Sequence, residues 1–67
     1  MLIHVYEKTY EIWKDGIYTE RNVSICVPDD RKRVTEAMQR LMDDYPESEG
    51  YELRYVTHRR YNYESDF

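Results

Sequence analysis

One stretch of this 67-residue chain has the periodicity of an amphipathic helix, and it lies between segments that resemble β-strands. Over residues 30–45 the apolar side chains recur at three- and four-residue spacing, as on one stripe of a helix. The stripe consists of Val34, Ala37, Met38, Leu41, Met42 and Tyr45. Asp29 or Asp30 can cap the start of this helix, and Pro46 ends it. A single helix covers only one face of a sheet, so we expect the other face to stay open.

Three segments have the composition of β-strands, because Ile, Val, Tyr, Thr and Trp are frequent in residues 2–13, 17–27 and 51–63. Asp15-Gly16, between the first two, is typical of a hairpin turn. The β-β-α-β order predicts an α+β fold, a three-stranded sheet with the helix packed on one face. A right-handed crossover gives the strand order 2-1-3, with 1-2-3 as the alternative. Alternation in the third strand predicts one common face for Tyr51, Leu53, Tyr55, Thr57, Arg59, Tyr61 and Tyr63.

The length of the hairpin turn decides which face of the sheet the helix covers, because a slip of one residue exchanges the two faces. A two-residue turn groups Tyr6, Tyr10 and Ile12 with Val23, Ile25 and Val27, and leaves Glu7, Glu11 and Glu20 on the open face. A three-residue turn groups Ile3, Val5 and Trp13 with the same valines and isoleucine, and leaves Tyr6, Tyr10, Tyr18 and Glu20 open. The hydrophobic pattern is compatible with both.

The length of the chain allows one small domain over residues 1–67, with a short tail at 64–67. The single cysteine, Cys26, excludes an intramolecular disulfide and suits a reducing compartment. The first residues lack the charged start and long apolar run of a secretory signal, and no apolar stretch is long enough to span a bilayer. We therefore expect a cytoplasmic protein.

Residues that could carry catalysis or bind a metal are few. Cys26 and His4 could lie opposite each other in the hairpin, but a half-buried thiol beside a surface histidine is the simpler interpretation. No glycine-rich phosphate loop, zinc-spaced ligand set or nucleophile elbow is present. The acidic pairs Asp29-Asp30 and Asp43-Asp44 are explained by helix capping and by a solvated helix end. We expect no enzymatic activity, no cofactor and no metal.

The tyrosine content is the feature that points to a function. The chain has eight tyrosines and one phenylalanine, and a phenol is favoured where one end of the ring is buried and the other meets water or a partner. The helix charges point the same way. Arg31-Lys32-Arg33 lies in the first turn and Asp43-Asp44 in the last, against the helix dipole. Charges that oppose the dipole are consistent with a role toward a partner.

These features predict a non-enzymatic protein-binding module, a small acidic inhibitor or adaptor. Its open face would cover a basic, nucleic-acid-handling surface of a larger protein, and no membrane is involved. The expected contact residues are Tyr10, Glu11, Tyr18, Glu20, Tyr61 and Tyr63. In size, acidity and tyrosine content the chain resembles the stand-alone inhibitors of bacteriophages and mobile elements, including anti-CRISPR proteins, without sharing a motif with them. An uncovered sheet edge would also permit a homodimer.

The alternative is a small protein that binds RNA or single-stranded DNA through the third strand. Aromatic rings on a sheet can stack on bases while arginines meet phosphates. The residues for this role are Arg54, Tyr55, Arg59, Arg60 and Tyr61. The net charge of −4 opposes it, because the chain as a whole repels phosphate.

Overall fold

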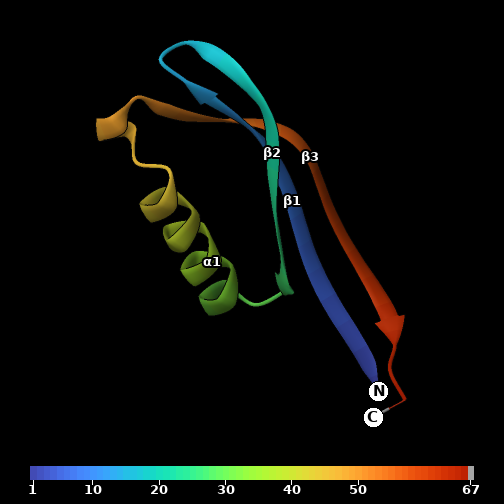
Figure 1. Cartoon of the computed structure of the whole chain (residues 1–67). Coiled ribbons are helices and arrows are strands. Elements are labelled where there is room, and N and C mark those ends of the chain that lie inside the picture. The colour runs from blue at the N-terminus through green and yellow to red at the C-terminus, as the bar shows by residue number, and fades with distance from the viewer. Residues whose placement is uncertain (67) are drawn as a thin grey trace.

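The computed structural model describes residues 1–66 as β1 (Leu2–Lys14), β2 (Ile17–Pro28), α1 (Arg31–Asp44), the 3-10 helix η1 (Glu47–Glu49) and β3 (Tyr51–Glu64). Both outer strands pair antiparallel with the central β1, in the order β2-β1-β3, and therefore run parallel to each other. The helix lies on one side of this sheet (Figure 1). The predicted α+β fold and its 2-1-3 strand order are confirmed.

The ends of α1 are set by residues that the sequence signals. The Asp30 carboxylate accepts a hydrogen bond from the Arg33 backbone N–H at 3.0 Å, so Asp30 rather than Asp29 caps the helix. At the other end the helix stops at Asp44, two residues before Pro46. Proline has no backbone N–H to donate, so the chain turns there into η1.

The hairpin between β1 and β2 has the two-residue turn, Asp15-Gly16. Tyr10 pairs with Val23, so the two-residue alternative is confirmed and the three-residue alternative is wrong. The register nevertheless shifts next to Ile12, where β2 holds two extra residues, Thr19 and Glu20. An even number of extra residues preserves the alternation of side chains, so the rest of β2 keeps its faces.

A bulge in β3 makes the predicted common face of that strand wrong. Thr9 pairs with Thr57 and Tyr10 pairs with Tyr55, so Val56 is one extra residue between them. One extra residue reverses the alternation. Tyr51, Leu53 and Tyr55 therefore lie on the helix side of the sheet, while Thr57, Arg59, Tyr61 and Tyr63 lie on the other side.

The core lies between α1 and the middle of the hairpin. Its buried members are Tyr6, Tyr10, Ile25 and Leu41, and around them pack Val23, Val27, Val34, Ala37, Met38, Tyr45 and Leu53. Val5 and Ile12 are also buried. The expected helix stripe is thus the face that packs on the sheet, except that Met42 is exposed.

The molecule is long and thin, with extents of 44 × 21 × 15 Å. Its radius of gyration, 13.9 Å, exceeds the value of about 11 Å for a compact domain of this length. The two ends of the chain meet at one corner (Figure 1): the Met1 amino group donates to the Ser65 carbonyl at 3.0 Å, and the Ser65 N–H donates to the Met1 carbonyl at 2.8 Å. The expected tail thus continues the ladder through Ser65, while Phe67 lies outside the described residues. Within residues 1–66, no helix has the length and apolar character needed to cross a membrane.

Candidate functional site

The open face is the side of the sheet away from α1, and within residues 1–66 no helix or strand lies across it (Figure 1). The pairing of the strands defines its residues. From β1 they are Ile3, Val5, Glu7, Thr9, Glu11 and Trp13; from β2, Tyr18, Asn22, Ser24 and Cys26; from β3, Glu52, Arg54, Thr57, Arg59, Tyr61 and Tyr63. Aromatic, charged, aliphatic and small polar side chains share this surface.

At the hairpin end of the open face, two rings and a guanidinium form a stack. The rings of Trp13 and Tyr18 have centroids 5.6 Å apart and an interplanar angle of 29°. The Arg54 guanidinium lies 3.6 Å from the Trp13 ring centroid, at cation–π distance. The Trp13 indole N–H donates to Glu11 at 3.0 Å, and Arg54 pairs with Glu52 at 2.7 Å. These contacts hold the indole and the guanidinium in place.

In the middle of the open face, Arg59 joins a carboxylate to a tyrosine. Its Nε is 3.2 Å from a Glu7 carboxylate oxygen, and its guanidinium lies 4.8 Å from the Tyr61 ring centroid. The Tyr61 hydroxyl lies 3.8 Å from Cys26 Sγ. This hydrogen bond favours the neutral phenol and holds the pKa of Tyr61 above its usual value.

Near the chain ends, the open face has an apolar notch of about 230 Å³. It is lined by Ile3, Val5, Cys26, Val27, Pro28, Tyr61 and Tyr63, and is called the terminal notch below. Val5 at its floor is only 6% exposed, whereas Tyr63 is 49% exposed. A solvent-facing ring beside an apolar recess is a feature of protein-binding surfaces.

The expected protein-contact residues are divided between the surface and the core. Glu11, Tyr18, Tyr61 and Tyr63 lie on the open face. Tyr10 instead lies under α1, 7% exposed, because the two-residue turn directs it to the core. Glu20 is exposed in the β2 bulge, with a φ of 65°. Trp13 was missed, although the two-residue register alone places it beside Tyr18.

The residues expected to bind nucleic acid do not form one surface. Arg54, Arg59 and Tyr61 lie on the open face, but Tyr55 and Arg60 lie on the helix side, because each follows an open-face arginine in the strand. Arg60 lies there over the Tyr6 ring, 5.3 Å from its centroid, and its Nε is 3.4 Å from an Asp29 carboxylate oxygen. Each arginine of β3 therefore already has a carboxylate partner within the chain.

Residues of catalytic or metal-binding type are dispersed. Cys26 lies opposite Glu7 rather than His4, and the His4 imidazole is hydrogen-bonded to Asn62 at 2.6 Å. Over residues 1–66, no three histidine, cysteine or acidic side chains come together as metal ligands would.

The sheet with its open face and one-sided helix defines the class of this chain as a small α+β domain. No known protein family, curated protein or solved structure matched the chain when it was compared with them.

Proposed function

We propose that this chain is a non-enzymatic protein-binding module, a small acidic inhibitor or adaptor that docks through its open face. Two features of that face support the proposal: the stacked rings of Trp13 and Tyr18 at one end, and the terminal notch beside Tyr63 at the other. Aromatic side chains and arginine are the residues most often found at the energetic centres of protein interfaces. The sheet holds them on a rigid support, so little conformational entropy is lost on binding.

The observation that carries the proposal is that each arginine of β3 is paired with a carboxylate of the same chain. Arg54 is paired with Glu52, Arg59 with Glu7 and Arg60 with Asp29. Each carboxylate neutralises part of the charge of its arginine, so the attraction of these guanidinium groups for a phosphate is reduced. A protein surface can pack on the rings and guanidinium planes as they stand. Protein binding is therefore favoured over the nucleic-acid alternative.

The charge of the chain suggests the character of the partner. The net charge is −4, and the open face carries three of the carboxylates, Glu7, Glu11 and Glu52, against two arginines. An acidic module associates fastest with a basic surface. A larger protein that handles nucleic acid has such a surface, and an inhibitor of the type that bacteriophages make against defence systems would cover it.

The test is recovery of the partner from the native host with the tagged chain, in nuclease-treated and untreated halves. A protein partner that survives nuclease treatment is expected. Its affinity is then measured for Tyr63→Ala and for Tyr55→Ala, a matched pair on one strand, since these tyrosines are 49% and 61% exposed on opposite faces. Tyr63→Ala should weaken binding at least about tenfold, equal to ~1.4 kcal/mol, while Tyr55→Ala should leave it unchanged.

Two results would overturn the proposal. Equal losses from Tyr63→Ala and Tyr55→Ala, in variants that remain folded by circular dichroism, would show that the open face is not the contact surface. Recovery that disappears with nuclease, together with loss of binding in Arg59→Gln, would establish the nucleic-acid alternative instead.

A further inference from the structure

A second cavity lies on the helix side of the sheet, where α1 ends, η1 turns and β3 begins. It has a volume of about 550 Å³ and is lined by Met42, Tyr45, Glu47, Gly50, Tyr51, Glu52 and Leu53. This volume is within the range of about 300–1,000 Å³ that is usual for pockets that hold small ligands. This cavity is called the η1 pocket below. None of them belongs to the contact set expected from the sequence.

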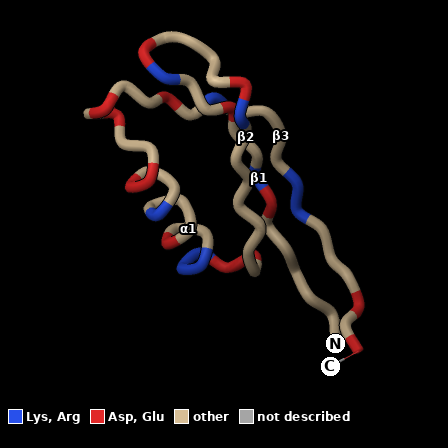
Figure 2. Tube along the Cα trace, viewed as in Figure 1, with Lys and Arg blue, Asp and Glu red and all other residues tan. Residues whose placement is uncertain are grey.

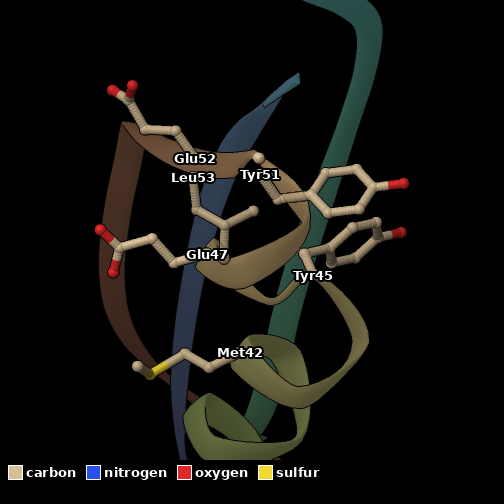
Figure 3. Close-up of a pocket in the computed structure, with 7 residues that line it drawn as sticks. Met42, Tyr45, Glu47, Tyr51, Glu52 and Leu53 are labelled. Atoms are coloured by element: carbon tan, nitrogen blue, oxygen red, sulfur yellow. The ribbon is translucent and has the colours of Figure 1, made fainter. Parts of the chain in front are cut away.

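The η1 pocket combines an apolar floor with two unlike sides. Figure 3 shows the rings of Tyr45 and Tyr51 together on one side, the Glu47 and Glu52 side chains on the other, and Leu53 between them. The two rings meet edge to face, with centroids 5.4 Å apart. Met42 is 55% exposed, although it belongs to the apolar stripe of α1. A methionine left in water beside a cavity is available to pack on an incoming side chain.

The electrostatics of this end of the molecule favour a cation. The last turn of α1 holds Asp43 and Asp44 and no basic residue, at the end where the helix dipole is already negative. Figure 2 shows acidic residues at the end of α1 and around η1, and basic residues at the start of α1. This arrangement costs helix stability, because each of these charges opposes the helix dipole.

Two cations of the chain contact residues of the pocket. Lys14 lies 4.7 Å from the Tyr51 ring centroid, and Arg54 pairs with Glu52 from the open-face side of the sheet. Among the described residues, no cationic side chain is paired with the Glu47 carboxylate. The pocket thus keeps an apolar floor, two half-buried aromatic rings and the unpaired carboxylate of Glu47.

We propose that the η1 pocket receives an arginine side chain of a partner protein. The aliphatic stem would pack on Met42 and Leu53, and the guanidinium would lie between the tyrosine rings and Glu47. Arginine fits better than lysine because its planar guanidinium can stack on a ring and bind a carboxylate with two hydrogen bonds at once. The inference rests on the proposed function only in assuming a protein partner, since the pocket and the open face are on opposite sides of the sheet.

The test is a titration of the ¹⁵N-labelled full chain with acetyl-Gly-Arg-Gly-amide, followed by the amide resonances of Gly50, Tyr51 and Leu53. The matched probe carries citrulline, which has the shape of arginine without its charge, and a third probe carries lysine. The arginine peptide should give saturable shifts at these amides. Binding should be several-fold weaker for lysine and at least about tenfold weaker for citrulline.

Matched variants of the chain separate pocket recognition from general attraction between charges. Glu47→Gln should weaken binding of the arginine peptide at least threefold, while Glu36→Gln, the same charge change on an exposed part of α1, should not change it. Met42→Ser should also weaken binding, because it removes exposed apolar contact area. Tyr63→Ala should retain full peptide binding, so failure of the open-face proposal and failure of the pocket proposal are distinguishable.

Three results would overturn the inference. The first is equal binding of the arginine and citrulline peptides, since charge would then have no role. The second is an equal effect of Glu47→Gln and Glu36→Gln, which would indicate attraction to the net charge alone. The third is a pattern of shifts confined to residues of the open face.

Discussion

The strands β1 and β3 are nearly equal in length and both are rich in aromatic residues, yet they have opposite environments. β1 has 13 residues and supplies four of the six buried side chains, whereas none of the 14 described residues of β3 is buried. Tyr10 of β1 is 7% exposed and its cross-strand partner Tyr55 of β3 is 61% exposed. One residue type thus builds the core in one strand and the surface in the next.

Position in the sheet explains the difference. β1 is paired on both sides, and α1 packs over the hairpin that β1 forms with β2 (Figure 1). β3 is an edge strand, and among the described residues it contributes only the half-buried Leu53 to the core. Two of its tyrosines, Tyr55 and Tyr63, are exposed and contribute little to folding, while Tyr51 and Tyr61 are half-buried.

The largest expected effect comes from removing a core side chain of β1 and comparing it with β3. Ile12→Ala, at a site only 3% exposed, should lower the free energy of unfolding by about 2–5 kcal/mol. Tyr55→Ala should lower it by less than about 0.5 kcal/mol, because the ring is mostly in water. Urea unfolding followed by circular dichroism measures both. Comparable losses would mean that β3 supports the core as strongly as β1.

The next largest loss of stability is expected at Gly50, where the start of β3 contacts the hairpin turn that follows β1. Gly50 has a φ of 89°, and its carbonyl accepts the Asp15 N–H at 2.8 Å, which ties the start of β3 to the hairpin turn. A Cβ at Gly50 would meet the Asp15 carboxylate, whereas a Cβ at Gly16, with a φ of 80°, would meet nothing.

Gly50→Ala should therefore cost about 1–3 kcal/mol, and more than the ~1 kcal/mol expected for Gly16→Ala from the left-handed backbone alone. Thermal unfolding of the two variants tests this order. A larger loss from Gly16→Ala would show that the contact between the turn and β3 is unimportant.

A smaller effect on stability is expected from the contact between Trp13 of β1 and Arg54 of β3. A double-mutant cycle with Trp13→Leu and Arg54→Gln should give a coupling energy of about 0.5–1 kcal/mol, because the guanidinium lies 3.6 Å from the ring centroid. Chemical denaturation of the four chains supplies the cycle. A coupling near zero would mean that the contact between Arg54 and the Trp13 ring adds nothing to stability.

The smallest expected effect concerns Tyr61 of β3. Its pKa is raised mainly by the hydrogen bond with Cys26, so Cys26→Ala should lower the pKa of Tyr61 toward its usual value of about 10. The raised pKa adds stability that is fully present below pH of about 10 and is lost as the pH rises through the folded-state pKa. The ring carbon resonances of Tyr61 report this titration. An unchanged midpoint in Cys26→Ala would assign the shift to another cause.

Much of the fold could be predicted from local sequence. The helix has a clear stripe and ends near residues that signal its boundaries, and each strand ends within one residue of its expected limit. The bulges could not be predicted. Val56 is β-branched, as are many strand residues, and the side chains on both sides of it alternate regularly. The reversal of faces at Val56 depends on pairing with β1 and has no local signal.

The candidate site could also be predicted only in part from the sequence. The two-residue register alone would have separated Tyr10 from Tyr18, but the hydrophobic pattern could not choose that register. Packing of α1 on Tyr6 and Tyr10 makes the choice, and that is a tertiary effect. The η1 pocket likewise arises where the end of α1 meets the start of β3, so neither segment indicates it by itself.

The adjacency of the two chain ends has a practical consequence for how this molecule can be held. The Met1–Ser65 hydrogen bonds bring these two residues to one corner, while the end of α1 and the start of β3, which line the η1 pocket, lie toward the far end of a body 44 Å long (Figure 1). If the molecule were immobilised on a solid support through either end, the hairpin turn and the η1 pocket would therefore face away from the support. For the same reason, a short linker from Ser65 to Met1 would close the backbone into a ring without moving a strand.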